Sequence, residues 1–95
     1  NSAGNYIKFA DGTLINYMPL LTPATAAFNN YEFPYPFVDT DITFSGTVHS
    51  NSSTGHMVKV DYPDITPTHF DAAVVVGTGG YSQANFGMTA IGRWK

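Results

Sequence analysis

Histidine is the first residue type to consider, because its imidazole ligates metals and transfers protons near neutral pH. The chain has three, His49, His56 and His69. They lack the close spacing of a zinc site, and no two of them form an H-x-H pair on one strand. His49 and His56 flank one loop and would approach each other if that loop joins a hairpin. We predict no metal site and no cofactor, and we consider His56 the most suited of the three to contact a ligand.

Carboxylates are the second candidates, because glycoside hydrolysis needs two of them held roughly 5–9.5 Å apart. The chain has seven acidic residues. Asp39 and Asp41 would share one face of an extended segment, and Asp61 and Asp64 bracket a proline turn. Acids in such positions are ordinarily solvated turn or edge residues, and a chain this short has little room for a cleft. We therefore predict no glycosidase site.

Two further catalytic patterns are also unsupported. The segment 77–81, GTGGY, could be taken for a phosphate loop. Such loops present backbone N–H groups at the start of a helix, whereas the residues that follow here are typical of a strand. No serine stands in a G-x-S-x-G setting. We predict that no residue is catalytic and that the chain is not an enzyme.

Aromatic, amide and hydroxyl side chains in loops suit a different chemistry, the recognition of sugars. An aromatic ring packs against the C–H face of a pyranose, while amides and hydroxyls pair with its hydroxyl groups. Residues of these types gather in the segments 50–56 and 77–85. Taken singly, each is more often a turn former; taken as a set, they make ligand binding a competitive interpretation. The candidate binding residues are Asn51, Ser53, Thr54, His56, Thr78, Tyr81, Gln83 and Asn85.

Composition limits what these residues can belong to. The chain of 95 residues makes one domain, and a domain of this size buries only about 60–65% of the surface of its unfolded chain. There is no cysteine, so no disulfide compensates for a thin core. Aromatic residues make up 15% and charged residues only 12%, against about 25% charged in an average domain. An aromatic-rich, charge-poor chain without disulfides favours an oligomer that shares apolar surface.

Charge and hydropathy exclude two classes of partner. The net charge is −3, and the firm cations are four in number and scattered along the chain. They form no basic patch for nucleic acid or for an anionic membrane surface. No apolar run approaches the roughly 20 residues of a membrane span. We predict neither nucleic-acid binding nor membrane insertion.

The elements that must position these residues are strands. No window repeats apolar residues at helical spacing beyond a single turn, for which only residues 24–28 qualify, and β-branched and aromatic residues alternate between glycine and proline turns. The sequence predicts an all-β domain, a small antiparallel sandwich or meander of about six strands. The turn Asp11-Gly12 is a strong hairpin signal, and the segment 19–35 is irregular because it is broken by proline. The predicted strands cover residues 6–10, 13–18, 37–49 (with a bend near 39–41), 57–62, 65–76 and 85–94.

Alternation assigns faces to the later strands. In 57–62 it places Val58, Val60 and Tyr62 on a buried face. In 85–94 it places Phe86, Met88, Ala90 and Trp94 together, opposite a face with Thr89, Ile91 and Arg93. The last strand and the opening hairpin are expected to close the domain by pairing with each other.

Strand order predicts which loops share an end. Connections after odd strands lie at one end of an antiparallel domain and those after even strands at the other. With six strands, the turn at 11–12 and the loops 50–56 and 77–84 share the distal end. The N-terminal segment, residues 19–35, the turn at 63–64 and the C-terminus are then expected at the opposite end.

With these elements placed, the chain resembles the C-terminal tip domain of bacteriophage tail fibres, a family shared with prophage and phage-like tail particles. Three segments carry the resemblance. Residues 4–15, GNYIKFADGTLI, are similar to the family's G-Y-x-K-x-x-D/N-G-x-x-I start. Residues 33–37, FPYPF, are similar to its F-P-x-x-F before a long strand, and residues 90–94, AIGRW, to its A-I-G terminal strand. Unlike many tip domains, this chain has Tyr17-Met18 rather than Trp soon after the first hairpin.

The resemblance implies a homotrimeric tip at the distal end of a virion's tail fibre. Residues 1–5 would be a linker from the fibre shaft and residues 6–95 the tip domain. The tip would attach to a host cell by binding a bacterial surface polysaccharide or another cell-surface receptor, with the distal loops supplying the candidate binding residues. An alternative is a structural cap that trimerises a fibre shaft without touching the receptor. Subunit contacts would involve Phe37, Met88, Ile91 and Trp94.

Overall fold

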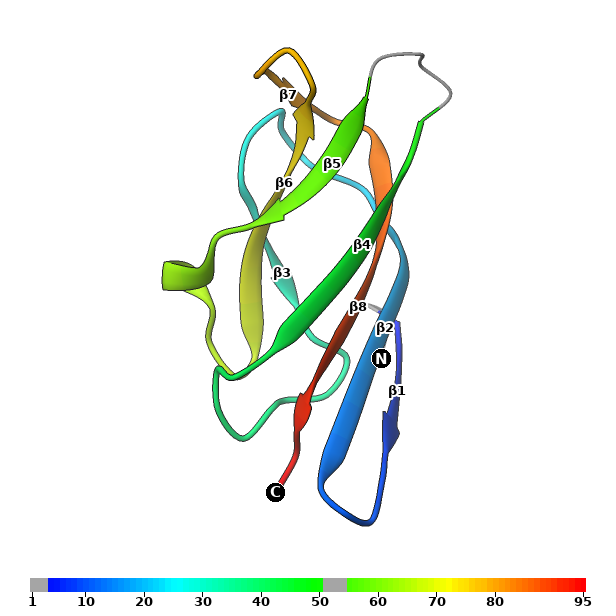
Figure 1. Cartoon of the computed structure of the whole chain (residues 1–95), viewed down its shortest axis with the longest axis vertical. Coiled ribbons are helices and arrows are strands. Elements are labelled where there is room, and N and C mark those ends of the chain that lie inside the picture. The colour runs from blue at the N-terminus through cyan, green and yellow to red at the C-terminus, as the bar shows by residue number, and fades with distance from the viewer. Residues whose placement is uncertain (1–3, 51–54) are drawn as a thin grey trace.

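The computed structural model describes residues 4–50 and 55–95, and it confirms the all-β prediction (Figure 1). Three of the candidate binding residues, Asn51, Ser53 and Thr54, and most of the expected linker lie outside the described residues. Within the described part, eight strands and one 3₁₀ turn follow one another along the chain. They are β1 (Asn5–Lys8), β2 (Thr13–Leu21), β3 (Asn29–Glu32), β4 (Thr43–His49), β5 (His56–Val60), η1 (Tyr62–Asp64), β6 (His69–Val76), β7 (Tyr81–Ser82) and β8 (Asn85–Arg93).

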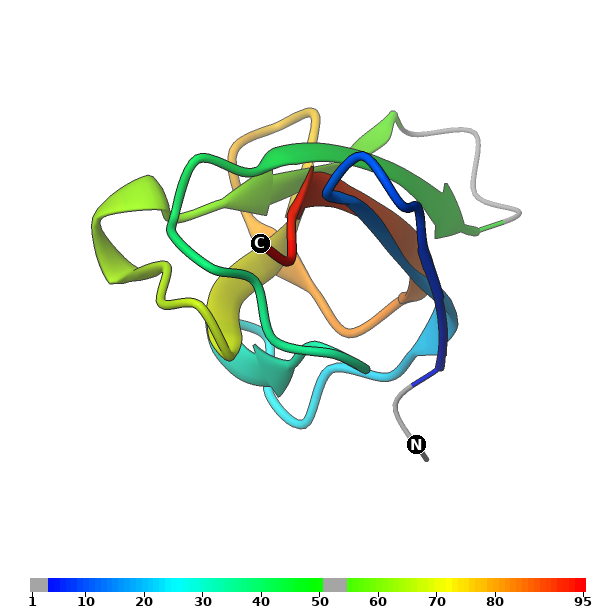
Figure 2. The same cartoon turned by 90° about the horizontal axis from the view of Figure 1, so that it is seen from below.

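The strands form two antiparallel sheets that face each other (Figure 2). Sheet A has the order β1-β2-β8-β4. Sheet B has the order β3-β6-β5, with β7 paired to β6 beyond the end of β3. The expected pairing of the two chain ends is confirmed, because β2 pairs with β8 from Thr13↔Arg93 to Met18↔Met88. The termini of the sequence therefore build the centre of sheet A.

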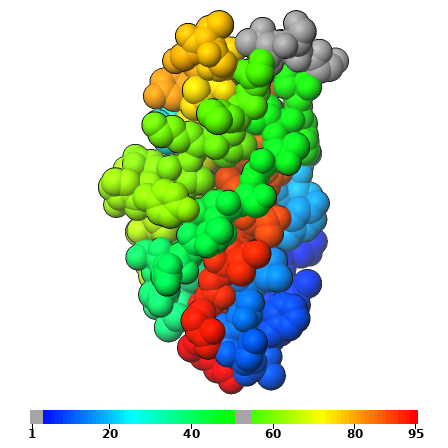
Figure 3. Space-filling view, viewed as in Figure 1, coloured from blue at the N-terminus to red at the C-terminus, as the bar shows by residue number. Residues whose placement is uncertain are grey.

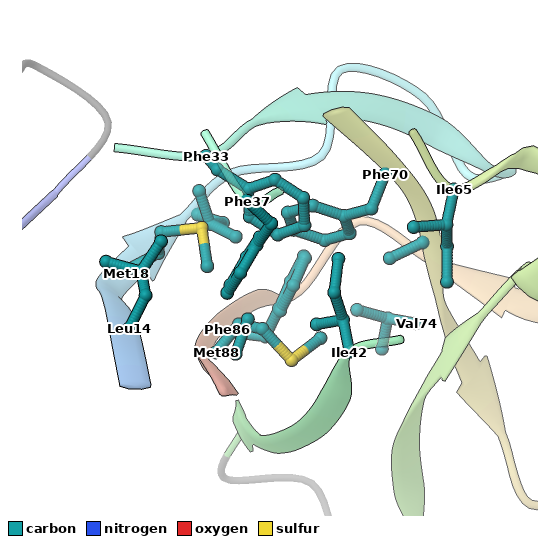
Figure 4. Close-up of a cluster of buried hydrophobic side chains, with 13 residues drawn as sticks. Leu14, Met18, Phe33, Phe37, Ile42, Ile65, Phe70, Val74, Phe86 and Met88 are labelled. Atoms are coloured by element: carbon teal, nitrogen blue, oxygen red, sulfur yellow. The ribbon is translucent and has the colours of Figure 1, made fainter. Parts of the chain in front are cut away.

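The core fills the space between the sheets with inward side chains of β2, β6 and β8 and with side chains of the connecting loops (Figure 4). In β8 these are Phe86, Met88 and Ala90, as the alternation predicted. In β6 Phe70 lies at the centre of an aromatic cluster, with the Phe33 ring stacked 5.0 Å from it. Fully burying one such side chain contributes about 1.5–3 kcal/mol. Much of the stability of this small domain therefore comes from the rings that join the two sheets.

The differences from the predicted elements are local. β3 and β7 were not predicted, because β3 consists of the polar residues NNYE and β7 has only two residues. Residues 37–42 form a loop instead of the start of a strand, and residues 24–28 make bends without a helix. Tyr62 was expected on a buried face, but it is exposed. The strand β5 ends at Val60, and Tyr62 begins the 3₁₀ turn η1.

The extra strand β3 changes which loops share an end. The described end of the 50–56 loop lies beside the turn at 77–80, as predicted, since the Gly77 N–H donates to the Gly55 carbonyl at 2.7 Å. The prediction was wrong for the turn at Asp11-Gly12, which lies at the opposite end beside the C-terminus (Figure 1). There the Trp94 N–H donates to the Gly12 carbonyl at 2.9 Å. One additional antiparallel strand between β2 and β4 inverts the direction of every later element relative to the first hairpin.

Candidate functional site

Three connections meet at one end of the sandwich, which we call the loop end. They are residues 22–28, the described residues Ser50 and Gly55 of the β4–β5 connection, and residues 77–80. Hydrogen bonds tie them together: besides the Gly77–Gly55 bond, the Gln83 side-chain Nε2 donates to the Ala24 carbonyl at 3.0 Å. The β6–β7 turn is closed by Val76 N–H to Gly80 at 2.8 Å. The loop end is therefore a connected surface built from three separate parts of the sequence.

Tyr81 is the most prominent predicted residue at the loop end. It begins β7, its Cα pairs with Val75 of β6, and its side chain is 49% exposed. The Phe28 ring lies edge-on to it, with 5.9 Å between centroids. Phe28 was not among the predicted binding residues, because nothing in the local sequence indicates that residues 28 and 81 meet. The pairing of β7 with β6 holds the tyrosine ring on a strand, so that its backbone position is fixed before any ligand arrives.

The other predicted residues divide between two places. Thr78 is exposed in the β6–β7 turn, and His56 begins β5 opposite Val76, so both lie at the loop end with Tyr81. Asn85 instead begins β8 and pairs with His49 of β4 in sheet A. His49 and His56 do not face each other across a hairpin ladder, because β4 belongs to sheet A and β5 to sheet B.

The opposite end, which we call the hairpin end, is closed by the C-terminal residues. The Trp94 Nε1 donates to the Phe9 carbonyl at 2.8 Å, and the Arg93 guanidinium donates to the Asp11 carbonyl at 2.7 Å. Lys8 and Lys95 place their ammonium groups 4.9 and 5.0 Å from the Trp94 ring. Cation–π contacts at such exposed positions contribute about 0.5–1 kcal/mol. The hairpin and the last three residues thus stabilise each other.

The predicted subunit contacts differ in their exposure. Phe37 and Met88 are 4% and 2% exposed and belong to the core of the single chain. The Phe37 ring also packs so closely on Gly92 that a Cβ there would lie 2.8 Å from it. These two residues have little surface left for a second subunit. Ile91 is 44% exposed and Trp94 is half-buried, so both retain surface that a partner could cover.

Among the described residues, the pKa values of Asp64, Asp11 and Tyr31 are shifted by their surroundings. Asp61 accounts for the raised pKa of Asp64, through a hydrogen bond and like-charge repulsion between the two carboxyls, and both flank or occupy the 3₁₀ turn at the surface. The Thr13 N–H donates a hydrogen bond to the Asp11 carboxylate at 2.9 Å, and this bond lowers the pKa of Asp11. Burial raises the pKa of Tyr31. No group of three potential metal ligands occurs in residues 4–50 and 55–95.

Comparison with known proteins adds no identification: no family model, curated protein or solved structure matches this chain. In the part of the chain that the structure describes, no helix has the length and apolar character needed to cross a membrane.

Proposed function

We propose that this domain is a non-enzymatic attachment module that binds a bacterial surface polymer, a glycan, through its loop end. The observation that carries the proposal is the half-exposed ring of Tyr81, held on a strand with Phe28 against it. Aromatic rings presented in this way pack against the C–H faces of sugars. Thr78 and His56 at the same end supply a hydroxyl and an imidazole that pair with sugar hydroxyl groups.

The setting we propose is the distal tip of a phage tail fibre on a virion, with three copies of the chain in each tip. The sequence motifs at residues 4–15, 33–37 and 90–94 support it, because they follow the order found in tail-fibre tips. A shallow site on a small domain binds weakly by itself. Three copies in a tip, and several fibres on a virion, raise the total affinity through effective concentration.

The proposal is tested by changing the tyrosine at the loop end. We expect the native chain to bind one or more polymers on an array of bacterial O-antigens and capsular polysaccharides. Tyr81→Ala should weaken that binding at least about tenfold, which corresponds to about 1.4 kcal/mol. Tyr62→Ala is the matched control, because Tyr62 is 57% exposed but lies on η1, away from the loop end. Equal binding by the native chain and Tyr81→Ala, or release of reducing ends from the polymer, would contradict the proposal.

The second candidate is a structural cap that trimerises a fibre shaft. A specific observation favours it: Ile7, Ile15 and Ile91 lie in register across β1, β2 and β8, with Ile7 and Ile91 57% and 44% exposed. An exposed apolar row of this kind suits contact between subunits. The cap hypothesis predicts that the chain binds no polymer on the array. It also predicts that the mass in solution is that of a trimer only while this row of isoleucines is intact. Polymer binding that depends on Tyr81 would contradict the cap.

A further inference from the structure

The outer face of sheet A carries a groove that lies apart from Tyr81 and Phe28. β8 runs as a band between β4 and β2 on this side of the molecule (Figure 3). Tyr17, Thr89 and Ser45 form one row across the three strands, and Gly87 and Thr47 pair in the next row. The groove has a volume of about 160 Å³. Its lining residues are Tyr17, Pro19, Ser45, Thr47, His49, Gly87, Met88 and Thr89.

A glycine and a bulge create the floor of this groove. The register of β2 on β8 shifts between Met18 and Leu21, so Pro19 lies in a β-bulge. Proline suits this position because it has no N–H to contribute to the ladder. A Cβ on Gly87 would lie 3.0 Å from the Pro19 carbonyl oxygen and 3.6 Å from His49 Nε2. Any side chain at position 87 would therefore enter the space beside the histidine, and glycine keeps it open.

The lining of the groove has the chemistry of a site for a neutral polyhydroxylated ligand. Tyr17, 49% exposed, supplies an aromatic face. Ser45, Thr47 and Thr89 supply hydroxyls that both donate and accept hydrogen bonds, and His49 supplies an imidazole. Among the described residues, the lining contains no carboxylate, lysine or arginine. An anionic or cationic ligand would lose hydration there without gaining a charged partner.

The size of the groove limits the ligand further. Clefts that enclose a drug-sized molecule measure roughly 300–1,000 Å³, and this groove is about half the smallest of these. It accommodates a single small ring rather than an extended ligand. The pairing of His49 with Asn85 places the groove at the part of sheet A that leads toward the loop at residue 50.

We propose that this groove is a second binding site, for one neutral sugar ring of a glycan. The ring packs its C–H face on Tyr17, and its hydroxyl groups pair with Ser45, Thr47, Thr89 and His49. The ligand class rests on the proposed function, but the location does not, because none of the lining residues belongs to the loop-end segments 22–28, 50–55 and 77–80.

The test is a titration of the chain with methyl glycosides of glucose, galactose and N-acetylglucosamine, followed by amide NMR shifts. We expect millimolar binding of at least one sugar, with the largest shifts at Gly87 and Thr89. The double variant Ser45→Ala/Thr47→Val should weaken it about tenfold or more, because two hydroxyl partners are lost. Thr43→Val is the matched control, since Thr43 lies exposed on the same face of β4 but outside the groove. Tyr17→Ala should abolish the shifts, whereas Tyr17→Phe, which keeps the ring, should retain them.

Three results would contradict the proposal that the groove binds a sugar ring. They are unchanged affinity in the Ser45/Thr47 double variant, shifts confined to the loop end, and a fall in oligomer mass caused by Tyr17→Ala, which would make this face a subunit contact. These results are distinguishable from failure of the attachment proposal. Polymer binding that needs Tyr81 while the groove variants behave as native refutes the groove alone. Sugar binding in the groove without any dependence of polymer binding on Tyr81 refutes the loop-end function alone.

Discussion

Asn16 provides the most direct test of how the fold is held together. It lies in β2 and is fully buried. Its Nδ2 donates to the Tyr35 carbonyl at 2.9 Å, and its Oδ1 accepts from the Tyr35 N–H at 2.9 Å. A side-chain amide thus imitates a strand neighbour and holds the 33–37 segment against sheet A. That segment supplies Phe33 and Phe37 to the core.

We expect Asn16→Ala to lower the free energy of unfolding by about 2–4 kcal/mol. The substitution leaves the N–H and C=O of Tyr35 without their partner, and each such buried group costs about 1–3 kcal/mol. Tyr35 is only partly buried, so the lower half of that range applies to each group. A domain of this size is stable by about 5–14 kcal/mol in total. The loss should lower Tm by about 10–25 °C.

Urea unfolding followed by circular dichroism measures the effect. Asn30→Ala is the matched control, because the Asn30 side chain is exposed and donates to Asp71 at 2.7 Å. It should cost less than about 1 kcal/mol. Equal losses in the two variants would show that the Asn16 amide does not hold the 33–37 segment against sheet A. Asn16→Asp provides a second readout: a neutral carboxyl satisfies both Tyr35 groups, whereas a carboxylate faces the Tyr35 carbonyl. Its stability should therefore be greatest below the pKa of an unfolded Asp, about 3.9, and fall as pH rises.

Two further predictions concern the surface. Asp64 has a raised pKa because of Asp61, so its contribution to stability is present below the ordinary Asp pKa of 3.8 and is lost as pH rises through the folded-state pKa. Asp64→Asn should raise Tm at pH 7 and have little effect near pH 3. Identical melting shifts at both pH values would contradict this. Trp94→Phe removes the 2.8 Å bond to the Phe9 carbonyl and weakens two cation–π contacts. The variant should lower the free energy of unfolding by about 1–2 kcal/mol. Amide hydrogen exchange should become faster at Gly12 and stay unchanged in β5 and β6. A uniform increase in exchange rate along the chain would contradict a local role for Trp94.

Much of the fold could be predicted because alternation is a local property. The inward positions Phe86, Met88 and Ala90 of β8 follow from a period of two residues, which any strand imposes on its side chains. The hairpin near Asp11-Gly12 follows from a short turn signal. Gly12 has a positive φ of 102° but Asp11 does not, so the turn differs from the two-residue type I′ turn, which needs positive φ at both central positions. These features needed no knowledge of which strands become neighbours.

The candidate site was less predictable because it depends on neighbours. Tyr81, Thr78 and His56 were predicted from residue type and do share the loop end, but Asn85 lies on the other sheet. Phe28 reaches Tyr81 only because the chain crosses between sheets at residues 22–28 and then forms β3. β3 has little strand propensity of its own and is stabilised by pairing with β6. Missing that strand also misplaced the first hairpin.

The sequence alone therefore determined the class of the fold, the inward faces of its strands and the pairing of its two ends. Only the tertiary structure decided which end each loop occupies and which side chains meet across strands. The groove brings residues 17–19, 45–49 and 87–89 together on one face of sheet A. Periodicity specifies on which side of a strand a residue lies, but the register between strands far apart in sequence is fixed by packing of the whole core.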